Sequence, residues 1–338
     1  MVAIDARDAR SPTRRGSDRY ARELCRALRS RGAGEGIELC FLEQGWPGPE
    51  LLWEEAALPV VLRRRGAALV HSLNWTFPLV RPCPGVVTIH DLAWEVYPED
   101  QPRKTRWKAR AIAPRAARSA ERVICVSRYT RDDVCERYGV KPEKVRVIGE
   151  APGLPHGDAE PPPGPYLLAA GDLRPRKNLL RLVEAFRTLH RDGIPHRLVL
   201  SGDDVLRRGG QIRAAAGDAP VELTGRVTDE ELDALMRGAD ALVFPSLYEG
   251  FGLVMVEAMA RGCPVVCSNA TALPETGGDA VRYFDPLDVD DMASAIRAVV
   301  TDRQVRDDLA RRGRARAESF TWEAAADETA AVYRELVA

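Results

Sequence analysis

Two glutamates that bracket a glycine-containing segment are well suited to bind a polyhydroxylated, phosphorylated ligand. Glu249 and Glu257 enclose Gly-Phe-Gly-Leu-Val-Met-Val. Carboxylates only accept hydrogen bonds, which suits sugar hydroxyls that donate them. The glycines let backbone N–H groups approach a ligand, and the helix expected to follow would direct the positive end of its dipole at a phosphate. The alternative is a helix N-terminus with an acid nearby and a second, solvated glutamate.

A group of cations between an expected strand and helix is suited to a diphosphate. The segment Gly171–Asn178 reads Gly-Asp-Leu-Arg-Pro-Arg-Lys-Asn. Arg174 and Arg176 offer planar donor forks, and Lys177 offers a compact charge. Cations at a helix N-terminus oppose the helix dipole, which disfavours a purely structural origin. A solvated basic loop is the alternative.

His90 and Asp91 follow the expected strand Val86–Ile89. The carboxyl end of a strand in an open parallel sheet is where ligands bind, so the position favours a role in a site. A structural role is an equally good interpretation, because a lone histidine is often structural and an aspartate after a strand is often a helix cap.

Composition narrows the class of protein. The chain has 338 residues, 45% hydrophobic content and a net charge of −1, so charge gives no case for nucleic-acid binding. No apolar run reaches the roughly 20 residues of a membrane span, and no signal peptide opens the chain, so we expect a cytoplasmic protein. Seven scattered cysteines fit a reducing compartment. Cys263 and Cys267 are expected to be buried thiols, and no metal site is predicted.

The tract Arg103–Arg122 carries eight cations, with Trp107 and Ile112 among them. We favour a solvated helix face, broken at Pro114. The alternative is a surface for an anionic acceptor or for membrane headgroups, which would make the protein peripheral at the inner face of the membrane.

The first half of the chain alternates expected strands and helices. A loop over 10–18 leads to a helix over 19–31, and Ser127 is expected to cap a helix that ends at Tyr138. Strands are predicted over 2–5, 37–41, 67–70, 86–89, 123–126 and 145–148. The Pro- and Gly-rich segment 151–165 cannot continue a helix or a central strand and is expected to link two domains.

The pattern restarts after the linker. A capping box, Thr228-Asp-Glu-Glu231, opens a helix to Arg237. The other predicted elements are strands over 166–170, 198–201, 221–223, 240–246 and 263–267 and helices over 177–190, 290–300 and most of 304–336. The alternation predicts an α/β protein of two doubly wound, Rossmann-like domains that face a cleft, residues 1–150 and 166–320.

Together these motifs resemble the retaining glycosyltransferases of family 4, which have the GT-B fold. The resemblance covers nearly the whole chain. It rests on 16–24, Thr88-Ile-His-Asp-Leu92, Ile124-Cys-Val-Ser127, 171–178, 245–257, Leu273-Pro-Glu275 and Phe320-Thr-Trp322. It implies that residues 321–338 form a helix that crosses back to pack on the N-terminal, acceptor-side domain.

The resemblance also implies roles for individual residues. Glu249 would contact the donor sugar near the reacting carbon, Arg176 and Lys177 the diphosphate, Glu257 the ribose, and His90 the sugar or acceptor. Other donor contacts would come from Gly171, Arg174, Arg226, Val227, Gly250, Phe251, Gly252, Leu253 and Val254. Asp18 stands where the nearest relatives have glycine, which favours contact of this loop with a basic acceptor over contact with the donor. Acceptor contact is predicted for Gly16, Asp18, Tyr20 and Asp91.

The function implied is transfer of a sugar from an NDP-sugar to an acceptor hydroxyl, giving an α-glycoside. The NDP-sugar is a co-substrate, and no further cofactor or metal is expected. The acceptor would be a small molecule, a glycan or a lipid-linked sugar. Two alternatives remain on the same fold: a sugar-nucleotide epimerase or hydrolase, and a non-catalytic protein that binds nucleotide sugars or glycans.

Overall fold

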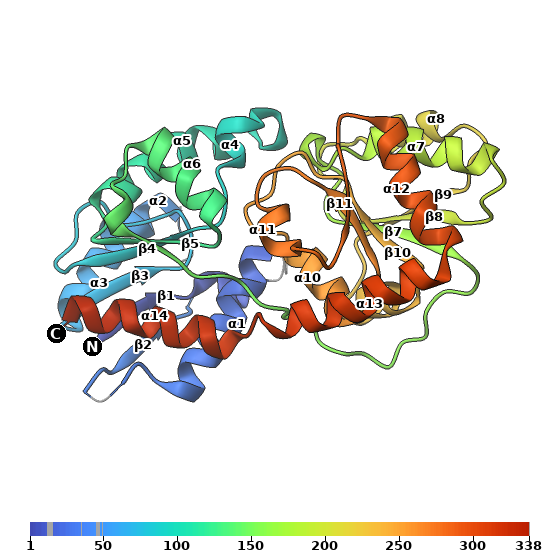
Figure 1. The fold of residues 1–338 in the computed structure, drawn as a ribbon. Coiled ribbons are helices and arrows are strands. Elements are labelled where there is room, and N and C mark those ends of the chain that lie inside the picture. Colours follow the sequence, from blue (N-terminus) through green and yellow to red (C-terminus); the bar gives the residue numbers. More distant parts are fainter. Residues whose placement is uncertain (12–15, 35, 45–47, 49, 338) are drawn as a thin grey trace. The chain divides into compact units, whose positions relative to one another are not determined.

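The chain forms two compact α/β units. In the computed structural model, residues 1–11, 16–34, 36–44, 48 and 50–337 are described (Figure 1). Unit 1 comprises Met1–Gly153 and Phe320–Ala338, and unit 2 comprises Leu154–Ser319. The division falls inside the Pro- and Gly-rich segment 151–165. Across the described residues, no helix is both long and apolar enough to cross a membrane.

Unit 1 is built on a parallel sheet in the order β2-β1-β3-β4-β5-β6. Its inner strands are short and buried on both faces, as expected for a parallel sheet covered by helices. The strands are β1 (Val2–Asp5), β2 (Leu39–Leu42), β3 (Leu69–Ser72), β4 (Gly85–Ile89), β5 (Arg122–Cys125) and β6 (Val145–Val147).

Helices complete unit 1, and the C-terminal helix belongs to it as predicted (Figure 1). Helix α14 (Trp322–Val337) contacts helix α1 (Gly16–Arg31) and strand β3. Tyr333 on α14 bonds through its hydroxyl to His71 Nδ1 at 2.6 Å, in the buried core. The remaining helices are η1 (Arg7–Arg10), α2 (Glu50–Leu52), the π-helix η2 (Trp53–Ala57), α3 (Leu58–Arg64), α4 (Ala93–Val96), η3 (Pro98–Asp100), α5 (Arg103–Ser119), α6 (Arg128–Tyr138) and η4 (Pro142–Lys144).

Unit 2 has a parallel sheet in the order β12-β11-β10-β7-β8-β9. Its strands are β7 (Tyr166–Ala170), β8 (Arg197–Ser201), β9 (Val221–Gly225), β10 (Ala241–Phe244), β11 (Val265–Ser268) and β12 (Arg282–Phe284). Its helices are η5 (Pro175–Lys177), α7 (Leu179–Arg191), α8 (Gly209–Ala216), α9 (Asp229–Gly238), α10 (Leu253–Ala260), α11 (Leu273–Gly277), α12 (Val289–Thr301) and α13 (Arg303–Glu318).

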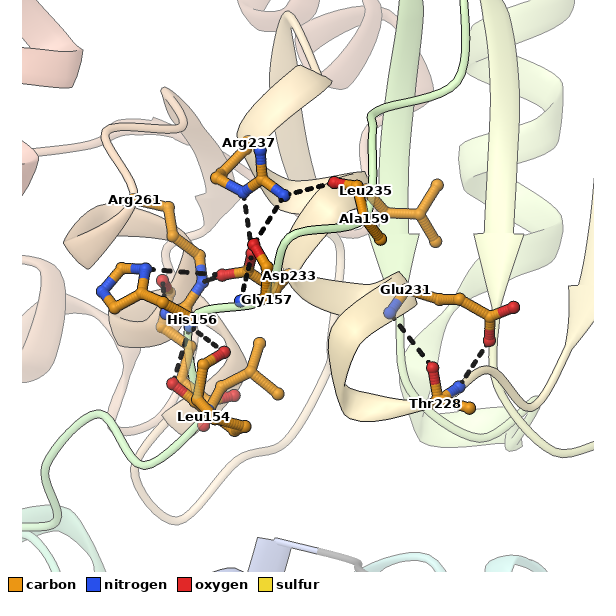
Figure 2. A network of polar contacts seen from close by, with 12 residues as sticks. Leu154, His156, Gly157, Ala159, Thr228, Glu231, Asp233, Leu235, Arg237 and Arg261 are labelled. Atoms are coloured by element: carbon orange, nitrogen blue, oxygen red, sulfur yellow. Dashed lines mark hydrogen bonds and ion pairs between the residues drawn. The ribbon is translucent and has the colours of Figure 1, made fainter.

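A buried ion-pair network fastens the first residues of unit 2 to its helices (Figure 2). Asp233 on α9 accepts from Arg261 Nε at 2.7 Å and from Arg237 Nε at 2.7 Å. Arg261 also donates to the carbonyl of Leu154 at 2.7 Å, and the N–H of Gly157 donates to Asp233 at 3.2 Å. The segment that enters unit 2 is therefore held by one buried carboxylate and its two arginines.

Local signals placed several helix ends correctly. The Ser127 side chain accepts from the N–H of Thr130 and caps α6, and Thr228 and Glu231 form both bonds of a capping box at α9 (Figure 2). Cys263 and Cys267 are buried, as expected.

Other boundaries were wrong. Helix α1 begins at Gly16, so Gly16 and Asp18 belong to its first turn and not to a loop; Asp18 there complements the helix dipole. Helix α5 continues through Pro114, because the alanines and Ile112 around it are buried in the core and this packing outweighs the lost backbone bond. Strand β12 and helices α3, α8 and α11 were not predicted; each is short or lacks a clear apolar period.

Candidate functional site

The order of the second sheet explains why two distant loops meet. Strands β7 and β10 are neighbours, although β8 and β9 lie between them in the sequence and on the other side of β7 in the sheet. This reversal of strand order is a topological switch point, where the loops at the carboxyl ends diverge and leave room for a ligand. One of these loops carries Arg176 and Lys177, and the other carries Glu249.

The structure brings Arg176, Lys177 and Glu249 into one cluster. Lys177 Nζ lies 2.5 Å from Glu249 Oε1, and Arg176 Nη1 lies 3.1 Å from Glu249 Oε2. Arg176 also donates to the carbonyl of Tyr248 at 2.8 Å, and its own carbonyl accepts from the N–H of Leu247 at 2.8 Å. The two loops are thus bonded through both side chains and backbone, which fixes the spacing of the three charges.

The electrostatics of the cluster favour an anionic ligand. Burial alone would raise the pKa of Glu249, but the charges of Lys177 and Arg176 and the hydrogen bond from Lys177 lower it to about 2. Glu249 is therefore ionised at neutral pH and sets one negative charge against two basic side chains, although burial lowers the pKa of Lys177. The remaining positive charge, on side chains 12–15% exposed, can attract a phosphate group.

Helix α10 begins beside this cluster and needs glycine at its start. Gly252 caps the helix with φ of 97°, a left-handed conformation that side chains disfavour. A Cβ at Gly252 would also lie 2.8 Å from Leu273 Cδ2. Gly250, Phe251 and Leu253 are buried and Val254 is half-buried. The helix begins at Leu253, four residues after Glu249, and the first N–H groups of an α-helix have no partner within the helix.

Gly171 lies against a second glycine that the sequence did not single out. A Cβ built on Gly202 would lie 2.1 Å from the Gly171 carbonyl oxygen and 2.9 Å from the N–H nitrogen of Asp172. The N–H of Gly171 donates to the carbonyl of Ser201 at 2.8 Å. The loop that carries the cations is therefore seated directly on the end of β8, and only glycine at 202 allows this approach.

Three further predicted donor residues have defined surroundings. Arg174 is buried and pairs with Asp172 at 3.2 Å, so the arginine neutralises the nearby carboxylate. Arg226 is exposed and pairs with Asp203 at 3.0 Å, with Val227 half-buried beside it. Both arginines belong to loops at the carboxyl ends of strands.

Glu257 is fully buried within α10. The predicted contact with a ribose would require its carboxylate to become accessible through movement of neighbouring side chains. Its role in ribose binding stays a prediction.

His90 in unit 1 is held by two acceptors. Its Nδ1 lies 2.9 Å from Glu150 Oε1, and its Nε2 donates to the carbonyl of Leu73 at 3.0 Å. Burial alone would lower the pKa of His90, but the hydrogen bond and charge of Glu150 raise it above its ordinary value. The two contacts fix the orientation of the His90 ring between Glu150 and the carbonyl of Leu73.

The other predicted acceptor-side residues have mainly structural contacts. The Asp91 carboxylate accepts from the N–H of Ala93 at 2.9 Å and so forms a turn at the start of α4. Tyr20 is fully buried, with its ring edge-on to His90 at 4.6 Å between centroids. Asp18 is buried in the first turn of α1, whereas Gly16 is exposed.

Comparison with known proteins identifies the family of the chain. Residues 157–316 match the family model "Glycosyl transferases group 1", and residues 35–150 match "Glycosyltransferase Family 4". The chain is 32% identical to O-antigen chain mannosyltransferase B of Escherichia coli over 79% of this chain and 74% of that protein. The chain belongs to glycosyltransferase family 4.

Other relatives and structures fit the assignment. The enzyme is 32% identical to the MMP alpha-(1->4)-mannosyltransferase of Mycolicibacterium hassiacum, over 81% of this chain and 69% of that one. Its fold matches sucrose-phosphate synthase of Thermosynechococcus elongatus with a TM-score of 0.76, 25% identity and coverage of 99% and 98% of the two chains. It also matches HepE of Anabaena, solved with UDP and glucose, with a TM-score of 0.73, 19% identity and coverage of 99% of each chain. These neighbours place the glycosyltransferase in the GT-B fold.

Two residues that contact the predicted site residues were not recognised from the sequence. Glu150 follows β6, and His90 follows β4, so β5 separates their strands and no local pattern links them. Gly202 follows β8 as an isolated glycine. Such a glycine can indicate that another backbone segment lies close, but only the structure shows which segment it is. Among the described residues, no group of three or more His, Cys, Asp or Glu side chains is placed to hold a metal ion.

The basic tract of this glycosyltransferase is partly used in internal contacts. Lys108 pairs with Glu50 at 3.0 Å and Glu54 at 3.1 Å, and Arg110 pairs with Glu95 at 2.9 Å. Trp107 is 71% exposed. The face is thus neither wholly solvated nor a continuous surface of unpaired cations.

Proposed function

We propose that this glycosyltransferase transfers a sugar from an NDP-sugar to an acceptor hydroxyl with retention, forming an α-glycoside. The observation that carries the proposal is the cluster of Arg176, Lys177 and Glu249 at the switch point of the second sheet. A nucleotide sugar offers a diphosphate to the two cations and hydroxyls to the carboxylate. The structural neighbour solved with UDP and glucose supports a nucleoside diphosphate donor.

The costly step is departure of the diphosphate. The bond from the anomeric carbon to the phosphate oxygen breaks, and its electron pair stays on the phosphate. The acceptor oxygen bonds to the anomeric carbon on the same face, and its proton passes to the departing phosphate, so no protein nucleophile is needed. Arg176 and Lys177 stabilise the developing phosphate charge, while ionised Glu249 accepts from donor hydroxyls beside the developing positive charge.

Site-directed removal of the lysine charge tests this assignment. Loss of one well-placed charge stabiliser costs about 3–4 kcal/mol of barrier, so Lys177→Ala is expected to lower kcat roughly 100-fold or more. Arg213→Ala removes the same charge from an exposed position on α8 and is the matched control. Turnover of Lys177→Ala equal to that of the control, in folded protein, would refute the diphosphate role.

Nucleotide panels separate transfer from the alternative functions. Nucleoside diphosphates and their sugars are screened by thermal unfolding, where a ligand at 100 times its Kd adds about 2.7 kcal/mol of stability. Each donor that binds is then incubated with and without glycan acceptors. Conversion of the donor alone would indicate an epimerase or hydrolase, and binding without any conversion would indicate a binding protein.

A further inference from the structure

The loop that follows β11 contacts the segment that carries Glu249. Strand β10 pairs with β7 on one side and with β11 on the other. The segment after β10 is therefore flanked by two loops, 171–178 after β7 and 269–272 after β11. The second loop comes within hydrogen-bond distance, because the N–H of Glu249 donates to Thr271 Oγ1 at 3.0 Å. The sequence gave no reason to single out Thr271.

Thr271 has a backbone conformation that threonine rarely adopts. Its φ is 56°, in the left-handed region, which is strained for a side chain branched at Cβ. The N–H of Leu273 donates to the carbonyl of Ala270 at 3.2 Å and closes a turn in which Thr271 is the second residue. Turns with a positive φ at this position are dominated by glycine, asparagine and aspartate. Strain of this kind persists only where the surroundings hold it, and it is frequent at functional sites.

The peptide unit between Tyr248 and Glu249 is held from both ends. Its carbonyl, which belongs to Tyr248, accepts from Arg176 Nη1 at 2.8 Å. Its N–H, which belongs to Glu249, donates to Thr271. A peptide unit is planar, so two bonds at its opposite ends fix the rotation of the whole plane. Because this plane leads directly into the Cα of Glu249, its orientation also affects where the Glu249 carboxylate lies.

The hydrogen bond to Glu249 explains why a strained threonine stands in this turn. For the turn alone glycine would be the better residue, because it takes a positive φ without strain. Glycine has no side chain, however, and could not accept the N–H of Glu249. A hydroxyl oxygen has the lone pairs to accept it. The loop is also packed tightly near its end, since a Cβ built on Gly252 would lie 2.8 Å from Leu273 Cδ2.

We propose that Thr271 is a positioning residue for sugar transfer. Its strained backbone holds a hydroxyl acceptor against the N–H of Glu249, and this bond directs the Glu249 carboxylate at the donor sugar. Thr271 has this role only if the enzyme transfers a sugar from a nucleotide donor, so the assignment rests on the proposed function. Since Thr271 acts on Glu249 and leaves both cations in place, its loss should slow transfer more than it weakens binding of the diphosphate.

Two substitutions separate the hydroxyl of Thr271 from the shape of its side chain. Thr271→Val keeps the branching and removes the acceptor, so kcat should fall roughly tenfold, the upper range for one hydrogen bond. Thr271→Ser keeps the acceptor and should restore most of kcat. KM for the donor selected by the nucleotide panel, and Kd of its nucleoside diphosphate, should stay near those of the unchanged enzyme. Thr301→Val is the matched control, because it removes a hydroxyl that donates to the carbonyl of Arg297 at an exposed position on α12.

Amide hydrogen exchange tests the bond to Thr271 without any ligand. In Thr271→Val the Glu249 amide should exchange roughly tenfold faster, because its hydrogen bond is lost. The amide of Leu247, which donates to the carbonyl of Arg176 at 2.8 Å, should exchange at the same rate in both proteins. An unchanged rate at Glu249, or equal acceleration at both amides, would overturn the assignment.

Thr271→Gly tests whether the strain serves the chemistry. Its Tm should lie close to that of the unchanged enzyme, because relief of strain offsets the lost hydrogen bond. Its kcat should nevertheless fall as in Thr271→Val. Arg207 also has a positive φ, of 55°, at an exposed position, so Arg207→Gly relieves similar strain and should leave kcat unchanged. Full turnover by Thr271→Gly would show that the threonine is not needed for transfer.

Comparison with Lys177→Ala distinguishes the two levels of failure. If Lys177→Ala loses turnover and Thr271→Val keeps it, Thr271 is not a positioning residue and the proposed function stands. If both variants keep full turnover, the cluster around Glu249 is not the site and both assignments are wrong. If Thr271→Val loses Tm, nucleotide binding and kcat together, Thr271 only supports the fold of the loop and its positioning role is refuted.

Discussion

Substitution of Gly202 gives the sharpest test of how the loop 171–178, which carries Arg176 and Lys177, is positioned. The side chain of Gly202→Ala would lie 2.1 Å from the carbonyl oxygen of Gly171 and 2.4 Å from its carbonyl carbon. Both contacts are to backbone, so no side-chain rotation relieves them. The two segments must separate by about 1 Å, and a misplacement of that size in groups that position a substrate costs on the order of 100-fold in rate.

The assay compares Gly202→Ala with Gly210→Ala. No atom lies within 4 Å of a Cβ built on Gly210, which is in helix α8. That control should keep its turnover and gain stability, since alanine is favoured over glycine in a helix by roughly 1 kcal/mol. Gly202→Ala should lose about 1–3 kcal/mol of stability from overpacking, a fall in Tm of about 2–4 °C per kcal/mol in a unit of this size.

The kinetic result decides between a positioning role and a merely structural one. If Gly202→Ala turns over a nucleotide-sugar donor as fast as the control, while its Tm falls as expected, the shift of the loop does not change the rate of sugar transfer. The inference that residues 171–177 position the diphosphate would then be refuted. Slow turnover in folded protein, with weaker binding of the nucleoside diphosphate, would support it.

The remaining predictions concern His90 and the buried network of unit 2. Because Glu150 raises the pKa of His90, this pair stabilises unit 1 fully below pH of about 6.5 and less as the pH rises through the higher folded-state pKa. Glu150→Gln should lower the pKa of His90, measured by NMR of the imidazole, and remove that loss of stability; an unchanged pKa would contradict the assignment. Asp233→Asn should lower stability by about 3–5 kcal/mol, because it leaves buried Arg261 without its ion pair. Thr228→Ala, on the same helix, should cost only about 1 kcal/mol in thermal unfolding; equal losses would show that the network adds little.

The sequence by itself determined the elements with strong local signals. Apolar runs such as those around Val86 and Leu242 predicted buried parallel strands, and the caps at Ser127 and Thr228 placed helix starts. These features depend on residues close together in the chain, so a local pattern contains the information. Arg176, Lys177 and Glu249 could be recognised as candidates for the same reason, since each lies in a loop after a predicted strand.

Tertiary structure decided which of these residues meet. The order of the strands, which no local pattern encodes, makes β7 and β10 neighbours and so joins Lys177 to Glu249. It also leaves Glu257, which the sequence paired with Glu249, fully buried within α10. The pairing of His90 with Glu150 arises in the same way, because the long-range packing of parallel strands sets which loop ends share an edge of the sheet.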